Sequence, residues 1–269
     1  METIDSILMV QKRRVETEVA DAQLRHGVWE DLAAVARPDS RFHLRFTEFI
    51  PDFAGAADAV ERLVCLPDFA RATHVFLTPD NSLTGLRQRC LEAGISVVVS
   101  SYDMARGFFH FPAGSVPRDL ARYAAWLDGL EHFAKPVSLA ELAALGRFDW
   151  VVTGAAAVAT SGVRFGRGHG WFDLEWRLFG ELGLVDARTP IATLVHDVQV
   201  LEQPLFPAEE DIPVDVICTP SRTLQVPRVQ SRPRRIDWAR ISQSQIQAAP
   251  ALRELRQAQG LSAPQNPSS

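Results

Sequence analysis

The sequence predicts a doubly wound α/β domain whose mostly parallel sheet is covered by helices on both faces. The first observation is that short β-branched runs alternate with helical patterns between Asp39 and about residue 220. The second is that these runs are almost continuously apolar, as expected for strands that are buried on both faces of a parallel sheet. We also expect helical extensions at the N- and C-terminal ends of this domain.

Five strands are expected, at residues 73–77, 95–99, 149–153, 191–195 and 214–218. In a doubly wound sheet, ligands bind beyond the carboxyl ends of the strands. We therefore expect the functional site among the loops that follow Thr153, Val195 and Thr219.

Three segments between these strands carry apolar residues at helical spacing, which predicts helices that cover the faces of the sheet. Their apolar stripes are Leu83, Leu86, Cys90 and Leu91; Leu120, Tyr123, Leu127 and Leu130; and Phe172, Trp176, Phe179 and Leu182. Each helix is expected to bury its stripe against the strands.

The two ends of the chain differ from its centre. The first 35 residues favour helix, and Arg37, Pro38 and Asp39 end it. We expect residues 1–226 to form one domain that includes this helix. Residues 227–269 are expected to add a C-terminal extension, with short helices in 236–258 and a disordered tail from Gly260.

The composition excludes several classes of protein. The 269 residues are 46% hydrophobic and 23% charged with a formal net charge of −5, which argues against DNA binding and makes RNA binding unlikely to be the function. No apolar run approaches the roughly 18 residues of a membrane span, and the acidic residues 1–5 do not resemble the start of a secretory signal. We therefore expect a cytoplasmic protein that does not bind membranes. Its oligomeric state is not predicted.

The three cysteines, Cys65, Cys90 and Cys218, lie far apart in apolar contexts. Their spacing favours buried free thiols over disulfides or a zinc site.

A basic loop with alternating glycines is the most informative segment. Gly166, Gly168 and Gly170 precede the predicted Phe172 helix, so the backbone amides of the loop and the start of the helix could bind an anion. Arg164 and Arg167 could add bidentate contacts to phosphate. The spacing fits neither a Walker A motif nor a dinucleotide-binding fingerprint. The alternative is a flexible turn with solvated arginines.

Asp173 lies in the first turn of the helix that follows this loop. Its charge would favour the helix dipole, but it could also bind Mg²⁺ beside a triphosphate. Asp211 is the expected second carboxylate ligand. Glu209, Glu210 and Asp215 compete for that role, unless the whole segment is a solvated acidic turn.

Among the other polar candidates, His169 in the glycine loop is the better functional histidine. His196 at a strand end more often has a structural role. Trp171 is the aromatic side chain that we expect to be exposed for stacking, whereas Phe172 and Trp176 belong to the core stripe. No Gly-x-Ser-x-Gly elbow or cluster of Cys and His indicates hydrolase or zinc chemistry.

Residues 164–173, 196–200 and 211–215 resemble the 5-formyltetrahydrofolate cyclo-ligase family, also called 5,10-methenyltetrahydrofolate synthetase. Residues 170–175 are more similar to its divergent branch, the methenyltetrahydrofolate synthetase domain-containing proteins. Supporting matches to that branch lie at 28–32, 50–56, 91–94 and 219–222, so the resemblance spans about residues 24–226.

The resemblance implies an α/β fold that binds ATP, Mg²⁺ and a reduced folate or related small molecule. In this family the formyl oxygen of 5-formyltetrahydrofolate takes phosphate from ATP, the folate N10 closes the ring, and phosphate leaves. The ATP site would then comprise Arg25 with Arg164, Phe165, Gly166, Arg167, Gly168, His169, Gly170, Trp171, Phe172 and Asp173. Asp173 and Asp211 would bind Mg²⁺, Arg167 and His169 would be catalytic, and Trp171 would contact the substrate.

Several positions depart from the family pattern. The family's N-terminal lysine is Asp21 here, its two aromatic hydroxyls are Trp171 and Phe172, and the arginine usual after Asp173 in bacteria is Leu174. The folate-side glutamate near the second helix has no counterpart in residues 81–84.

Three functions follow as hypotheses. The first is the cyclo-ligase reaction itself, and the second is an ATP-dependent reaction on another small formamide or amide. The third is a non-catalytic nucleotide- or RNA-associated module, which is weakened because residues 227–269 hold no aromatic RNA-binding motif.

Overall fold

The computed structural model describes residues 23–24, 26–203, 205, 211–228 and 231–261. Several of the predictions above lie outside these residues: Arg25, Asp21 with most of the N-terminal helix, the acids Glu209 and Glu210, and most of the tail. Residues 26–32 are helical, which agrees with the helix predicted at the N-terminal end.

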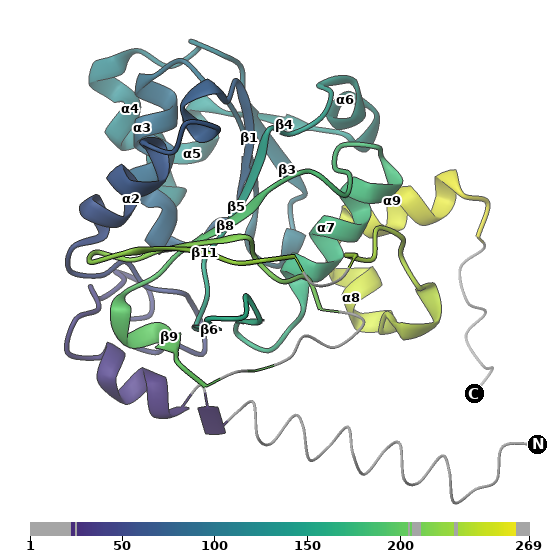
Figure 1. The fold of residues 1–269 in the computed structure, drawn as a ribbon. Helices are drawn as coiled ribbons and strands as arrows, with labels where there is room; N and C mark the ends of the chain where they lie inside the picture. The colour runs from purple at the N-terminus through teal and green to yellow at the C-terminus, as the bar shows by residue number, and fades with distance from the viewer. Residues whose placement is uncertain (1–22, 25, 204, 206–210, 229–230, 262–269) are drawn as a thin grey trace, which may run out of the picture.

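A central sheet organises the described part of the chain (Figure 1). Its strands are β1 (His74–Leu77), β2 (Ser96–Ser100), β3 (Phe108–Phe111), β4 (Lys135–Val137), β5 (Trp150–Thr153), β8 (Ile191–Leu194), β10 (Val216–Cys218) and β11 (Thr223–Gln225). They lie in the order β11-β10-β8-β5-β1-β2-β3-β4. The five from β10 to β2 are parallel, whereas β11, β3 and β4 pair antiparallel at the two edges. The predicted doubly wound, mostly parallel sheet is confirmed.

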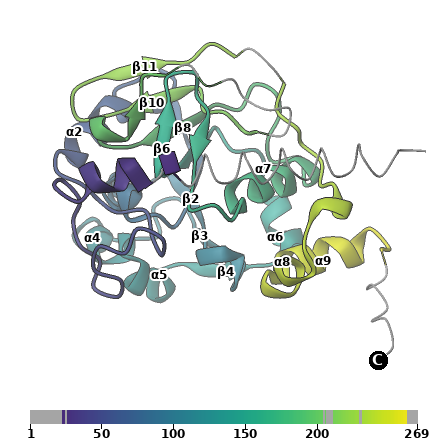
Figure 2. The same cartoon turned by 90° about the horizontal axis from the view of Figure 1, so that it is seen from below.

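Helices cover both faces of this sheet. One face carries α2 (Ala56–Val64), α3 (Thr84–Glu92), α4 (Ala121–Ala125) and α5 (Leu127–Phe133), and the other carries α6 (Leu139–Ala144), α7 (Trp171–Glu181) and α9 (Pro250–Ala258), with α8 (Gln243–Ala248) beside α9. Figures 1 and 2 show the two groups on opposite sides of the strands. Short 3-10 helices lie at Phe69–Arg71, Asn81–Leu83, Tyr102–Met104, Arg118–Leu120, Asp197–Gln199 and Trp238–Arg240.

Neighbouring strand residues enter different hydrophobic cores. Val75 and Leu77 pack under α2 and α3, whereas Phe76 between them packs under α7. Because both faces are buried, these strands need apolar side chains at every position. This explains why their sequence runs are continuously apolar. In the described residues, no helix is both long enough and apolar enough to span a membrane.

One predicted stripe is wrong. The chain is extended at Trp126 (ψ 142°), so the segment forms two short helices, α4 and α5, instead of one. Leu120 and Tyr123 are exposed, and the small residues Ala121 and Ala124 face the core in their place. The stripe of α7 is correct, since Phe172, Trp176 and Phe179 are all buried.

The cysteine prediction is correct for two of the three residues. Cys90 and Cys218 are buried free thiols, but Cys65 is exposed. Cys65 follows the last residue of α2, whose buried positions are Ala59, Val60 and Leu63, so it lies off the apolar stripe.

The described C-terminal residues pack against α7. Ile236, Leu252 and Leu255 belong to the same hydrophobic cluster as Trp176 and Phe179. The division of the chain at residue 226 stays a prediction.

Gly180 of α7 sets how closely this C-terminal segment approaches. A Cβ atom at Gly180 would lie 2.2 Å from the carbonyl oxygen of Arg234. Gly180→Ala is therefore expected to push this backbone away and to lower the free energy of unfolding by about 1–3 kcal/mol, measured by urea denaturation. As a control, Gly85→Ala in α3 meets only an ordinary 3.6 Å contact with Val60. Its expected effect is a stabilisation of up to about 1 kcal/mol. Equal effects of the two changes would contradict this explanation.

We expect His74 to make the fold sensitive to acid. Its Nδ1 lies 2.8 Å from the Ser96 hydroxyl, and its Nε2 is buried without a partner among the described residues. Burial lowers the pKa of His74, and nearby His110 lowers it further. Just below the ordinary histidine pKa of about 6.5, His74 therefore binds a proton in the unfolded chain but remains neutral in the folded chain. The free energy of unfolding is then lost as the pH falls, by up to about 1.4 kcal/mol per pH unit for one such histidine.

The expected result is a smaller loss of stability between pH 7 and pH 5.5 in His74→Gln than in the wild type, measured by urea denaturation at both values. His132→Gln, on the exposed surface of α5, should keep the wild-type pH dependence. An unchanged dependence in His74→Gln would remove His74 from the explanation.

Candidate functional site

A cavity of about 760 Å³ lies at the carboxyl ends of β1 and β5. In the sheet, β1 lies between β2 on one side and β5 on the other. The order in which the chain adds strands therefore reverses at β1 and β5. Doubly wound sheets bind their ligands at this position. Thr78 and Asp80 after β1 and Thr153 at the end of β5 line the cavity.

The loops after Val195 and Thr219 do not line this cavity. They bind each other, because the Asp197 carboxylate accepts hydrogen bonds from the hydroxyls of Thr219 and Ser221. His196 also has structural contacts: its Nδ1 accepts from the Val198 amide at 3.2 Å, and its ring packs on Phe53.

A small second sheet positions the glycine loop. It consists of β6 (Ala157–Ala159), β7 (Arg164–Phe165) and β9 (Val200–Leu201), and the loop runs from β7 to the start of α7. Gly168 (φ 100°) and Gly170 (φ 67°) have backbone conformations that favour glycine. Residues 168–170 are exposed and border the cavity. The loop therefore presents an accessible backbone at the N-terminus of an 11-residue helix.

Arg164 is part of the cavity wall. Its side chain is only 7% exposed, lies 4.5 Å above the Phe172 ring and has Nη2 3.8 Å from an Asp173 oxygen. Its Nη1 donates a 3.4 Å hydrogen bond to the carbonyl of Gly154, while its Nε has no partner among the described residues. Arg164 is thus not the solvated arginine of a flexible turn.

Arg167 connects the glycine loop to two distant segments. Its Nη2 donates to Asp103 at 2.7 Å and its Nη1 donates to the carbonyl of Glu48 at 3.1 Å. Asp103 itself has a left-handed backbone (φ 54°), a conformation that costs energy for a residue other than glycine. The sequence did not predict these partners.

The other loop side chains are arranged as follows. His169 is exposed, and its carbonyl accepts a 3.2 Å hydrogen bond from Gln245 of α8. Trp171 is half-buried and lines the cavity, whereas Phe172 is buried. Helix α8 of the C-terminal segment therefore contacts the glycine loop directly.

Asp173 and Asp211 lie in the same cavity and interact electrostatically. Burial raises the pKa of Asp173, Arg164 lowers it and Asp211 raises it. The side chain of Asp173 remains 36% exposed. No group of three or more His, Cys, Asp or Glu side chains in the described residues could hold a metal ion. Two carboxylates fit Mg²⁺, which typically completes its shell with water and phosphate oxygens.

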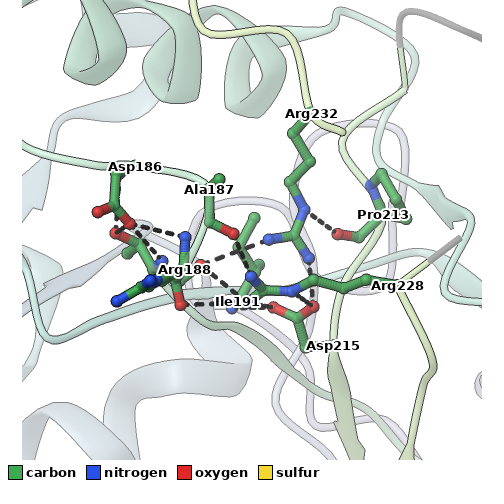
Figure 3. Close-up of polar contacts among 9 residues, drawn as sticks. Asp186, Ala187, Arg188, Ile191, Pro213, Asp215, Arg228 and Arg232 are labelled. Atoms are coloured by element: carbon green, nitrogen blue, oxygen red, sulfur yellow. Dashed lines mark hydrogen bonds and ion pairs between the residues drawn. The ribbon is translucent and has the colours of Figure 1, made fainter. Parts of the chain in front are cut away.

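Asp215, one of the competing candidates, has a different role. Figure 3 shows its carboxylate paired with both Arg228 and Arg232. The Arg232 contact is 2.6 Å, and the other carboxylate oxygen accepts from the amide of Ile191 at 2.8 Å. Asp215 therefore holds the first residue of β8 to the segment after β11.

The sequence predictions missed two acids of this cavity, Asp80 and Glu175. Asp80 accepts a 3.0 Å hydrogen bond from the amide of Gly154 and another from the Thr78 hydroxyl. Glu175 is only 3% exposed, and burial raises its pKa to about 8. Both had a signal in the sequence: Asp80 follows a strand end, and Glu175 stands three residues after Phe172 on the apolar stripe of α7.

The 5-formyltetrahydrofolate cyclo-ligase family matches residues 17–220. The methenyltetrahydrofolate synthase domain-containing proteins of Homo sapiens and Danio rerio are 32% and 30% identical over 246 and 241 residues, or 88% and 87% of this chain. The chain spans only 62% and 60% of the length of these relatives.

Among solved structures, the NMR structure of 5,10-methenyltetrahydrofolate synthetase from Aquifex aeolicus is 18% identical, with a TM-score of 0.47. The alignment covers 78% of this chain and 95% of that protein. Because the family match extends over most of the sequence and the relatives align over nearly nine tenths of it, this protein belongs to the 5-formyltetrahydrofolate cyclo-ligase family.

Proposed function

We propose that this protein is an ATP- and Mg²⁺-dependent cyclo-ligase that converts 5-formyltetrahydrofolate to 5,10-methenyltetrahydrofolate. One observation carries the proposal: a glycine loop at a helix N-terminus and two neighbouring carboxylates, Asp173 and Asp211, border one cavity at the switch point of the sheet. Membership of the cyclo-ligase family supports it. We also propose that the reaction takes place in the cytoplasm, without a DNA, RNA or membrane partner.

The loop suits a triphosphate. The exposed backbone of residues 168–170 and the start of α7 offer amide donors to phosphate oxygens. Asp173 and Asp211 would bind Mg²⁺, and the ion would neutralise part of the negative charge of the phosphates. Arg25, outside the described residues, is proposed to contribute to the same site.

In the proposed reaction, the formyl oxygen attacks the terminal phosphorus of ATP, and ADP leaves. The folate N10 then attacks the activated formyl carbon, and inorganic phosphate leaves as the ring closes. Arg164 would hold phosphate oxygens from the wall of the cavity, and Arg167 and His169 would act from the loop. Arg167 would have to exchange its contact with Asp103 for phosphate, or share it.

Trp171 would provide an apolar surface for the folate ring at the cavity wall. Phe172 has no hydroxyl and is buried under Arg164, so it cannot replace the second aromatic hydroxyl of the family.

A second candidate is an ATP-dependent reaction on another small formamide or amide. Trp171 and Phe172 favour it, because the two positions lack the hydroxyl groups expected for the family's substrate. Loss of such hydrogen-bond partners weakens recognition of the original substrate.

Phosphate release from ATP, measured with and without 5-formyltetrahydrofolate, tests the choice between these two candidates. The proposed cyclo-ligase releases phosphate only when the folate is present. Binding of ATP without any folate-stimulated phosphate release would favour the second candidate.

A further inference from the structure

Two acids at the wall of the cavity have no part in the proposed binding of ATP and Mg²⁺. Asp80 follows β1 and is 7% exposed, and Glu175 projects from α7 and is 3% exposed. Both side chains line the cavity and lie within electrostatic range of each other. Buried carboxyl groups in a folded protein need hydrogen-bond donors.

The protein supplies only some of these donors. Asp80 accepts hydrogen bonds from Thr78 and Gly154. Ser100 lies near Glu175, but the Ser100 hydroxyl is buried without a hydrogen-bond partner among the described residues. A carboxylate has about four acceptor positions. Acceptor positions of both acids are therefore left for a molecule in the cavity.

Other polar atoms of the same cavity also lack partners. The Tyr102 hydroxyl and the Nε of Arg164 are buried and have no hydrogen bond among the described residues. The Arg164 side chain is more than nine-tenths buried, so water does not satisfy it freely. Buried polar atoms without partners are uncommon in native proteins, and these two belong to residues that line the cavity.

We propose that Glu175 and Asp80 form a specificity-determining subsite for the edge of a flat ring that carries adjacent N–H donors, such as the aminopyrimidinone end of a pteridine. This deepens the proposed function, on which it rests, by naming the residues that would select the substrate. The family's folate-side glutamate has no counterpart in residues 81–84, at the start of α3. In the proposed subsite, Glu175 of α7 supplies an acid instead.

The number of acceptor oxygens on Glu175 and Asp80 determines which ring edge the subsite can bind. Two neighbouring carboxyl groups offer more acceptor oxygens than donors. A ring edge with an amino group and a ring N–H pairs with these oxygens. An edge on which an oxo group replaces the amino group places one acceptor against another and leaves both unpaired.

Pterin and lumazine provide this comparison, because lumazine carries an oxo group in place of the 2-amino group of pterin. Binding of each to the full chain would be followed by pteridine fluorescence, with the wild type, Glu175→Gln and the exposed surface variant Asp119→Asn. The wild type and Asp119→Asn are expected to bind pterin at least about tenfold more tightly than lumazine, the equivalent of about 1.4 kcal/mol. In Glu175→Gln this preference should fall to about twofold or less, since an amide NH₂ replaces an acceptor oxygen.

A wild type that binds neither compound, or both equally, would overturn the proposal, as would an undiminished preference in Glu175→Gln. Asp80 is left unchanged because it also holds Gly154 and Thr78. Thermal unfolding of each variant with and without ATP shows that the fold and the nucleotide site are intact. The pterin preference does not require turnover, so its failure is distinguishable from a failure of the cyclo-ligase reaction.

Discussion

Asp173→Asn is expected to weaken Mg²⁺-dependent ATP binding by about 100-fold or more. The change keeps the size of the side chain and removes the charge that would bind the metal. Asp173 is one of two acids beside the glycine loop, and Asp211 alone would leave the site with a single carboxylate. Asp211→Asn should therefore have a similar effect.

The measurement is the shift in unfolding temperature that ATP causes with and without Mg²⁺. At a concentration of 100 times its Kd, ATP stabilises the folded state by about 2.7 kcal/mol, and a 100-fold weaker variant retains only about 0.4 kcal/mol. Comparing each variant with and without ATP separates this loss from the small stabilisation that an acid gives to the start of a helix. Asp68→Asn, an exposed acid outside this cavity, should keep the wild-type shift. The same shift in Asp173→Asn would remove Asp173 from the metal site.

Arg87→Met should have the largest effect on stability, a loss of about 3–5 kcal/mol. Arg87 of α3 is fully buried, and burial lowers its pKa to about 10. Its guanidinium donates to the carbonyls of Thr78 and Asp80, at 3.2 and 3.5 Å, and to the carbonyl of Ala125. Methionine fills a similar volume but leaves these carbonyls without donors and the buried Asp80 carboxyl without its neighbouring positive charge.

Arg89→Met on the same helix is the matched control for Arg87→Met. Arg89 is exposed and forms a surface ion pair with Glu61, so its loss should change the free energy of unfolding by less than about 0.5 kcal/mol. Urea denaturation compares the two variants. Similar small losses in both would show that Arg87 does not hold the loop after β1.

The five central strands could be predicted because burial on both faces requires apolar side chains at successive positions. The edge strands lack this constraint. In β4 the sequence is Lys135, Pro136 and Val137, and proline is tolerated only where a strand has a free edge. Such a segment looks like a loop in the sequence, and only its pairing with β3 identifies it as a strand.

The glycine loop could be predicted for a similarly local reason. Positive φ angles at Gly168 and Gly170 leave a visible requirement for glycine in the sequence. The partners of Arg167 could not be predicted, because Glu48 and Asp103 are 119 and 64 residues away along the chain. Glu175 was missed because an acid on an apolar helix stripe looks like an exception until the cavity beside it is known.

Formation of the methenyl chromophore tests the proposed function most directly. Purified protein, 5-formyltetrahydrofolate, Mg²⁺ and ATP would be followed by near-ultraviolet absorbance, beside reactions without ATP and with Asp173→Asn. The cyclo-ligase proposal predicts a rise in absorbance that requires ATP and is lost in Asp173→Asn. No rise from a protein that ATP still stabilises against heat would contradict it, and would assign the nucleotide site to a different substrate.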